Sequence, residues 1–300
     1  MKTLPFASLA LSLSLVFSPV AAKEVSLVED GLTLHANLET AGADWQQGPF
    51  VLMTHGTLAH GEMELMQGLQ AALKDRGIGS LSLTLSLGLD QRRGMYDCAQ
   101  PHRHRHEDAL KEIGAWLTWL QSQGLTRSLI LLGHSRGGNQ AARFAAAHPE
   151  AALSHLVLLA PQTWTETGTA DDYQQRFGKP LPPLLERASQ MRDAGQADAL
   201  LEGVDFLYCP ATQASAAAFL SYYGPDPAMD TPGLLPGLKV PVLVVAGSQD
   251  QVVQGLTEKV QPLVDGRQVQ LLKLDGADHF FRDLYIEDIA DAVQALVSGD

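Results

Sequence analysis

The sequence is poor in several features that would mark a specialised protein class. Only two of its 300 residues are cysteine, aromatic residues make up 6% and charged residues 18%. So few cysteines exclude a small scaffold held together by disulfides, and 45% hydrophobic residues exclude a disordered chain. Lysine and arginine number 21 against 34 aspartates and glutamates, which gives a net charge of −13. We expect such an acidic chain to bind neither nucleic acid nor an anionic bilayer, because phosphate groups repel it.

Long apolar runs are also missing, except at the N-terminus. Lys2 precedes a largely apolar stretch over residues 4–17, and Val20-Ala21-Ala22 supplies the small residues of a signal-peptidase site. The stretch is shorter than the roughly 20 residues that a membrane span needs. We therefore predict a signal peptide at residues 1–22 and export of the mature chain to a periplasm or out of the cell. A membrane anchor is the alternative.

Hydrophobic periodicity along the rest of the chain predicts strands that alternate with helices. Such alternation indicates an α/β fold with a mostly parallel central sheet flanked by helices. Residues 161–238 break the pattern, because they are rich in proline and glycine and show only short helical patches. We predict that they form a helical cap or lid inserted into a core made of residues 23–160 and 239–300.

One short motif points to chemistry. Gly133-His134-Ser135-Arg136-Gly137 fits the pattern G-x-S-x-G, follows an apolar run and precedes a helical pattern. A strand that turns sharply into a helix crowds the backbone, and glycines at the flanking positions lack the Cβ atoms that would clash. Such a turn lifts the serine hydroxyl clear of the sheet. It predicts that Ser135 is a nucleophile, with a passive serine in a glycine-lined turn as the alternative.

In these features the chain resembles the α/β-hydrolase superfamily, and within it the serine esterases and lipases that carry a cap insert. The resemblance rests on the turn at 133–138, on His55-Gly56 after an early strand, on Asp250 after a late strand and on His279 after the last one. It covers nearly all of the mature chain. It implies an α/β-hydrolase fold and a catalytic triad in the chain order Ser135, Asp250, His279.

The residues themselves favour the same triad. A serine hydroxyl needs a base to take its proton, and His279 follows the predicted strand at 269–274, at the sheet edge where Ser135 is expected. Asp250 follows the strand at 240–246 and would orient the imidazole and stabilise its charged form. Asp275 and Asp278 are alternatives, but they lie so close to His279 in sequence that capping its turn suits them better.

A developing oxyanion needs fixed hydrogen-bond donors. We predict the backbone N–H groups of Arg136 and Thr57 for this role, with Leu58 as an alternative to Thr57. For the Arg136 side chain the alternatives are a salt bridge to the cap, contact with an acidic substrate and a plain surface position. Further candidates for substrate binding or for orienting the site are His55, His134, Tyr222 and Tyr223.

Two other features allow more than one interpretation. The run His102-Arg103-His104-Arg105-His106 could ligate zinc or could border the active site with Arg103 and Arg105 facing an anionic group. We favour a third interpretation, a solvated basic loop. Cys98 and Cys209 are expected to form a disulfide in an oxidising compartment, with two buried thiols as the alternative.

The sequence thus predicts an exported serine hydrolase that cleaves a carboxylic ester or thioester of a small molecule through an acyl-enzyme on Ser135. The mechanism needs no metal and no organic cofactor. The alternatives are an amidase or peptidase with the same triad and a non-catalytic binding protein that keeps the fold.

Overall fold

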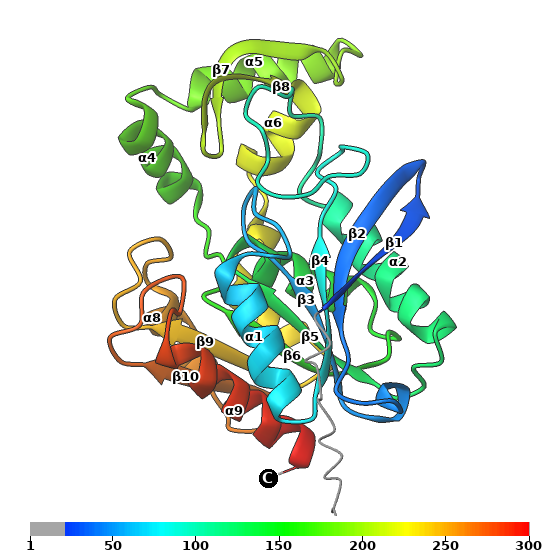
Figure 1. The fold of residues 1–300 in the computed structure, drawn as a ribbon. Coiled ribbons are helices and arrows are strands. Elements are labelled where there is room, and N and C mark those ends of the chain that lie inside the picture. The colour runs from blue at the N-terminus through cyan, green and yellow to red at the C-terminus, as the bar shows by residue number, and fades with distance from the viewer. Residues whose placement is uncertain (1–21, 300) are drawn as a thin grey trace, which may run out of the picture.

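The computed structural model describes residues 22–299, in which one large sheet forms the centre of the molecule (Figure 1). The predicted signal peptide, apart from Ala22, lies outside the described residues. None of the helices in the described part of the chain has the length and apolarity to cross a membrane.

Within residues 22–299 the large sheet has eight strands in the order β1-β2-β4-β3-β5-β6-β9-β10. The strands β1 and β2 pair antiparallel with each other and β2 pairs antiparallel with β4, whereas all the other pairs are parallel. The predicted α/β class with a mostly parallel sheet is therefore confirmed. The strand bounds are β1 Lys23–Glu29, β2 Leu32–Glu39, β3 Phe50–Thr54, β4 Gly79–Thr84, β5 Leu129–His134, β6 Leu153–Leu159, β9 Val242–Gly247 and β10 Val269–Leu274.

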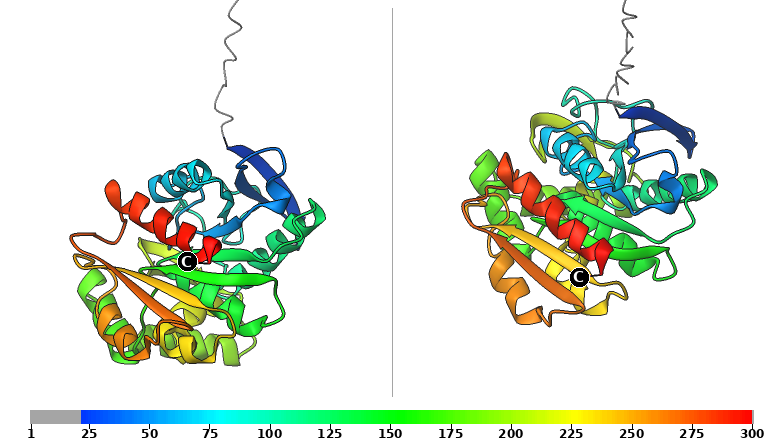
Figure 2. Two further views of the ribbon diagram at one scale, coloured as in Figure 1. Left: turned by 90° about the horizontal axis from the view of Figure 1, so that it is seen from below. Right: turned by 60° about the horizontal axis from the view of Figure 1, so that its bottom comes forward.

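Helices cover both faces of this sheet, as Figure 2 shows for α9 lying across the strands. On one face α1 (Glu64–Asp75) and α9 (Leu284–Ser298) pack on alternate strand residues such as Val51 and Met53. On the other face α2 (Asp108–Ser122), α3 (Arg136–Ala147) and α8 (Leu256–Val260) pack on the intervening residues, such as Leu52. Because side chains alternate between the faces of a strand and both faces are covered, β3 and β5 are buried over their whole length.

Residues 161–238 supply no strand to the eight-stranded sheet and lie mostly at its upper end in Figure 1. Their elements are α4 Glu166–Phe177, α5 Pro182–Asp193, β7 Leu200–Phe206, β8 Cys209–Ser215, α6 Ala216–Tyr223 and α7 Thr231–Leu234. Short 3-10 helices at Trp45–Gln47, Pro227–Met229, Leu235–Gly237 and Gln261–Leu263 complete the structure. A third apolar cluster joins this segment to the loops above the sheet, with Phe206, Phe219 and Tyr222 packed near Leu58 and Tyr96.

The expectation that this segment is helical was incomplete. It contains an antiparallel hairpin, β7–β8, which leads directly into α6. Ser215 caps α6 by accepting a hydrogen bond from the Ala218 N–H. Both strands contain residues with little local β preference, such as Gly203 in β7 and Pro210 in β8, so the pairing of the two strands decided their conformation. That the segment acts as a cap stays a prediction.

Candidate active site

Ser135 lies on a strained turn between β5 and α3. Its backbone has φ 55° and ψ −121°, a left-handed conformation that a non-glycine residue adopts only under constraint. The Ser135 N–H donates to the Leu159 carbonyl at 2.8 Å and its own carbonyl accepts from the Gly138 N–H at 3.0 Å. A Cβ at Gly133 would overlap the Gly137 carbonyl, and one at Gly137 would overlap the His55 carbonyl. The two glycines therefore permit the close backbone contacts that hold the serine in place.

His279 and Asp250 form a buried pair in the loops after β10 and β9. The distance from His279 Nδ1 to Asp250 Oδ2 is 2.8 Å, and the two side chains are only 6% and 5% exposed. Asp250 Oδ1 accepts hydrogen bonds from the N–H groups of Val252 and Val253 at 2.7 and 2.9 Å. Burial alone would raise the pKa of Asp250, but the bond from His279 and these N–H donors bring the pKa below its ordinary value. The carboxylate is thus ionised at neutral pH and fixes a proton on Nδ1.

His134, the neighbour of Ser135, holds the His279 loop. Its Nε2–H donates to the His279 carbonyl at 2.8 Å, and the two ring centroids are 4.8 Å apart. Burial lowers the pKa of His134 to about 4, with a further contribution from His279, so the ring is neutral. A neutral ring bonded in this way positions the His279 loop.

The parallel strands β4, β3, β5, β6, β9 and β10 end at the same edge of the sheet, which brings the loops with Ser135, Asp250 and His279 together. In residues 22–299 no hydrogen bond joins Ser135 Oγ to His279, a contact that is often long in the absence of substrate. Ser135 opens on a cavity of about 730 Å³ between this edge and the segment 161–238. The cavity gives a substrate access to the serine.

The proposed oxyanion donors lie on both sides of the serine. Arg136 is the first residue of α3, so its N–H has no partner within the helix. Thr57 follows the Thr54 end of β3, and both Thr57 and Arg136 line the cavity. The next residue, Leu58, has a left-handed backbone with φ 57°. Both residues that the sequence predicted for the oxyanion role thus line the cavity with Ser135, and the role itself stays a prediction.

A buried arginine that the sequence analysis did not single out fixes the turn with Thr57. Arg92 donates to the carbonyls of Ala59, Leu85 and Gly94 at 2.7, 2.6 and 2.7 Å. Burial lowers the pKa of Arg92 to about 10, which leaves it charged at neutral pH. No local signal marks this residue, because its partner Ala59 lies in the loop after β3, which meets the loop with Leu85, Arg92 and Gly94 only in the folded chain.

His55, predicted as a substrate-binding candidate, serves the same turn. Its Nδ1–H donates to the Gly56 carbonyl at 2.8 Å, and its Nε2 accepts from the Leu85 N–H at 3.1 Å. Burial and, to a smaller extent, the charge of Arg92 lower the pKa of His55 to about 3. His55 is 1% exposed and does not line the cavity. It supports the turn that leads to Thr57 through its bond to Gly56.

Glu112 lies in the same buried network and makes stability depend on pH. Its carboxyl accepts from the Ser86 N–H and hydroxyl at 2.8 and 2.6 Å. Burial raises the pKa of Glu112 from 4.5 to about 7, against the opposing effects of Ser86 and Arg92. Below pH 4.5 the Glu112 carboxyl is protonated in both the folded and the unfolded state. Between pH 4.5 and about pH 7 it is protonated only in the folded state. Stability is therefore lost as the pH rises through the folded-state pKa.

We expect Glu112→Gln to remove this loss. Between pH 5 and pH 8 the unfolding free energy of the natural protein should fall relative to that of the variant by up to about 3 kcal/mol. Urea unfolding at a series of pH values measures the difference. The exposed Glu186→Gln change serves as the control and should leave the natural pH dependence in place. Parallel pH curves for the natural protein and Glu112→Gln would contradict the assignment.

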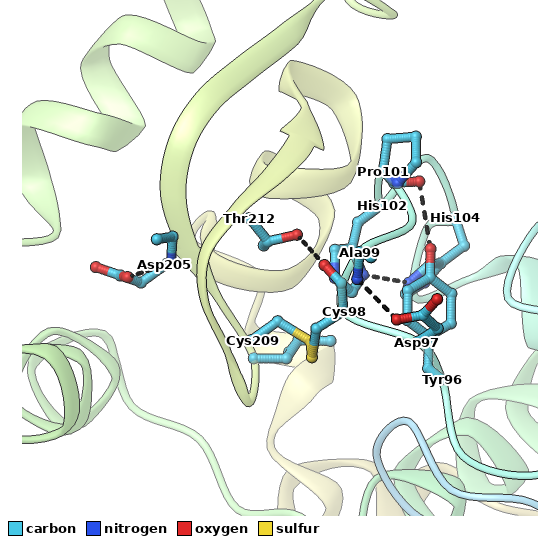
Figure 3. The surroundings of a disulfide bond; sticks show 12 residues. Tyr96, Asp97, Cys98, Ala99, Pro101, His102, His104, Asp205, Cys209 and Thr212 are labelled. Carbon is cyan, nitrogen blue, oxygen red and sulfur yellow. Dashed lines mark hydrogen bonds between the residues drawn. A yellow bond between two sulfur atoms is a disulfide. The ribbon is translucent and has the colours of Figure 1, made fainter.

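The interpretation of the histidine run as a solvated loop is wrong. His102, His104 and His106 are 0%, 1% and 0% exposed and pack with Tyr96, Phe206 and Tyr222. His102 Nδ1 is 3.1 Å from His104 Nε2, and His104 Nδ1 is 2.8 Å from the Tyr222 hydroxyl (Figure 3 shows His102 and His104). Burial lowers the pKa of His102 to about 4 and those of the other two well below the ordinary value. Uncharged imidazoles pack like aromatic rings, which the alternating basic sequence did not reveal.

The other predicted site residues separate into two groups. Tyr222 and Tyr223 line the cavity with Ser135. Arg103 and Arg105 do not line it, because Arg103 donates to the Asp198 carbonyl at 2.7 Å and Arg105 lies 3.9 Å from the Asp198 carboxylate. The alternation that buries the three histidines turns the arginines between them outward. The described residues contain no group of three His, Cys, Asp or Glu side chains arranged to hold a metal ion.

Cys98 and Cys209 form a disulfide, with Cα atoms 5.3 Å apart, that joins the loop before the histidine run to β8 (Figure 3). The Thr212 hydroxyl donates to the Cys98 carbonyl at 2.8 Å beside it. The bridge spans 111 residues of sequence and thus ties the segment 161–238 to the loops above the sheet.

We expect loss of this bridge to lower the unfolding free energy by about 2–4 kcal/mol, because an unlinked unfolded chain has more conformational entropy. Urea unfolding of the double variant Cys98→Ser, Cys209→Ser measures the change, and reduced natural protein should match it. Thiol titration of denatured, unreduced protein should find no free thiol. Two free thiols would contradict the bridge.

The arrangement of a serine on a strained turn, a histidine bonded to a carboxylate and two neighbouring N–H groups is the layout of enzymes that attack carbonyl carbons with a serine. The model of the alpha/beta hydrolase family matches residues 51–293, so the chain belongs to that family. A comparison with curated proteins finds no match.

Solved structures share the fold at low sequence identity. Est1E from Butyrivibrio proteoclasticus is 17% identical with a TM-score of 0.63, over 92% of this chain and 98% of that one. The monoacylglycerol lipase of Paleococcus ferrophilus is 18% identical with a TM-score of 0.59, over 89% and 99%. The thioesterase domain from the curacin biosynthetic pathway is 19% identical with a TM-score of 0.55, over 94% and 100%. The fold predicted from the sequence is thereby confirmed.

Proposed function

We propose that the protein is an exported serine hydrolase that cleaves a carboxylic ester or thioester through an acyl-enzyme on Ser135. The observation that carries the proposal is the 2.8 Å bond between His279 Nδ1 and Asp250 Oδ2, at the sheet edge where the strained turn presents Ser135. The names of the structural relatives, an esterase complexed with ferulic acid, a lipase and a thioesterase, agree with this substrate class.

In the first half of the reaction Ser135 Oγ attacks the carbonyl carbon of the substrate while His279 Nε2 takes the hydroxyl proton. Asp250 stabilises the imidazolium that forms. The Thr57 and Arg136 N–H groups donate to the oxyanion of the tetrahedral intermediate. The intermediate collapses to the acyl-enzyme when the bond to the leaving group breaks, and His279 gives its proton to the departing alcohol or thiol.

In the second half a water molecule attacks the acyl-enzyme and His279 takes one of its protons. The second tetrahedral intermediate breaks the bond to Ser135 Oγ, which regains a proton from His279, and the carboxylic acid is released. The cavity beneath segment 161–238 would hold the acyl group or the leaving group during both steps. The segment would in this way act as the cap.

A fluorophosphonate probe and a substrate panel test the proposal on the mature chain, residues 23–300. The probe should label the protein with a stoichiometry of one. The p-nitrophenyl esters of rising chain length and a matching thioester should be hydrolysed faster than aminoacyl amides. Faster amide cleavage would make the protein an amidase, and absence of both labelling and hydrolysis would leave a non-catalytic fold.

The exported location has its own test. Expression of the full chain in a Gram-negative bacterium should give a periplasmic product whose mass corresponds to cleavage after Ala22. A full-length product that stays in the cytoplasm would contradict export.

A further inference from the structure

The cavity beside Ser135 contains a cation with no matching anion. Arg136 Nε donates to the Thr57 hydroxyl at 3.0 Å, and its guanidinium carbon lies 5.0 Å from the centre of the Tyr222 ring. Arg136 Nη1 is buried and has no hydrogen-bond partner anywhere in residues 22–299. A buried guanidinium that uses only part of its five donors is costly unless something else satisfies the rest.

No carboxylate balances the charge of Arg136 among the described residues. The groups that act on it are the hydroxyls of Tyr222, Tyr223 and Tyr208 and the like charge of Arg176, and burial lowers its pKa. Lys259, which also lines the cavity, differs in this respect, because it bonds to Asp230 at 2.7 Å. Buried charges in proteins are normally paired. Arg136 therefore has the electrostatic environment of a residue that completes its pairing with a ligand.

The charged residues that line the cavity suit an anionic ligand. Arg136 and Arg176 both line it with Ser135, and the Arg176 guanidinium lies 4.5 Å from the centre of the Tyr208 ring. The cavity wall also includes Asp172, but no ion pair joins this carboxylate to either arginine. When the flat face of a guanidinium packs on a tyrosine ring, the N–H donors at the edge of the guanidinium stay available to a ligand.

The guanidinium is oriented before any ligand binds. Tyr222, on which Arg136 stacks, is fixed by the contact of its hydroxyl with His104, which in turn contacts His102. Thr57 fixes the Nε side. A donor group that is already ordered loses little entropy on binding. The buried histidine run thus supports the cavity wall through Tyr222.

We propose that the substrate of this site carries a free carboxylate that pairs with Arg136, with Arg176 as the second cation, while its ester or thioester carbonyl lies at Ser135. The proposal rests on the proposed function and names its substrate class: half-esters of dicarboxylic acids. A planar guanidinium matches a carboxylate with two parallel hydrogen bonds. Since Arg136 is the direct neighbour of the nucleophile, the carboxylate and the scissile carbonyl belong to the same short acyl chain.

A pair of substrates of equal length tests this proposal. Mono-p-nitrophenyl adipate and p-nitrophenyl hexanoate have the same leaving group and the same number of acyl carbons, and differ in a terminal carboxylate against a methyl group. The natural protein should have the higher kcat/KM for the adipate. Arg136→Gln keeps the backbone N–H but should lower the ratio of adipate to hexanoate kcat/KM by about 10- to 100-fold, the value of a charged hydrogen bond.

Control variants separate local from general charge effects. Arg176→Gln should lower the ratio by a smaller factor, and Arg192→Gln, an exposed arginine paired with Asp193 on α5, should leave the ratio unchanged. If Arg136→Gln lowers both rates by the same factor, the side chain acts on the oxyanion turn or on folding, and the proposal is overturned. A natural preference for hexanoate would also overturn it.

Binding without turnover separates this proposal from the proposed function. If neither ester is hydrolysed, the serine hydrolase assignment has failed, and the carboxylate site is tested on the same protein by calorimetric titration with adipate and with neutral adipamide. Binding of adipate alone, weakened at least about 10-fold in Arg136→Gln, supports the site. Equal binding of the two compounds, or binding of neither, overturns it.

Discussion

Replacement of Ser135 with alanine is expected to lower kcat for p-nitrophenyl esters by at least about 10,000-fold, because the nucleophile is lost and only binding and oxyanion stabilisation remain. The same change should abolish fluorophosphonate labelling. The strained conformation with φ 55° does not depend on the hydroxyl, since the contacts of Gly133 and Gly137 with the neighbouring backbone maintain it. We therefore expect the thermal midpoint to change little.

The control is Ser122→Ala at the exposed end of α2, whose hydroxyl donates to the Trp119 carbonyl at 2.6 Å and accepts from the Gln123 side-chain amide at 3.2 Å. It should keep full activity and full labelling. Persistence of more than about 1% of the natural kcat in a freshly purified Ser135→Ala protein would show that another residue carries the reaction.

Asp250→Asn is expected to have the second largest effect, a loss of about 1,000- to 10,000-fold in kcat. The amide keeps the size of the side chain and can still accept from the Val252 and Val253 N–H groups with its oxygen. It then presents its NH₂ group to His279 Nδ1, so that the ring takes the other tautomer and Nε2 carries the proton. An imidazole protonated on Nε2 cannot take the proton of Ser135. Steady-state kinetics on the mature chain measures the loss.

Two neighbouring aspartates provide matched controls for this change. Asp278 Oδ1 accepts from the Phe280 N–H at 2.9 Å, and Asp275 Oδ1 accepts from the Ser248 hydroxyl at 3.0 Å. Neither contacts the His279 ring, so Asp278→Asn and Asp275→Asn should each lower kcat by less than about 10-fold. If Asp275→Asn or Asp278→Asn lowered kcat more than Asp250→Asn does, that aspartate and not Asp250 would be the carboxylate that orients His279.

Local sequence signals were sufficient wherever neighbouring residues determine the conformation. The hairpin at the N-terminal edge turns through Asp30 and Gly31, which have φ 49° and 81°, as a two-residue turn of this kind requires. The predicted strand at residues 269–274 coincides with β10, since a short apolar run between polar turns has few other ways to be buried. The geometry around Ser135 follows in the same way from glycines within two residues of it.

Local sequence signals did not predict the burial or the contacts of side chains whose neighbours come from distant parts of the chain. The alternating histidines and arginines at 102–106 are as polar as any surface loop, yet β8 and α6 cover the histidines. Arg92 gave no signal because the Ala59 carbonyl, which lies in the loop after β3, reaches it only in the folded chain. The β7–β8 hairpin was missed for the related reason that strand pairing depends on the partner more than on the residue type.

The sequence by itself determined the alternation of strands and helices, the sharp turn that exposes Ser135 and the chain order of the three proposed catalytic residues, because each depends on spacing within a few residues. Only the tertiary structure decided that Asp250 contacts His279, that Arg92 holds the turn with Thr57 and that Arg136 is left without an anion beside the serine. These contacts depend on which loops come together at the edge of the sheet. The loops bury the side chains between them, and burial decides which hydrogen bonds form and which charges stay unpaired.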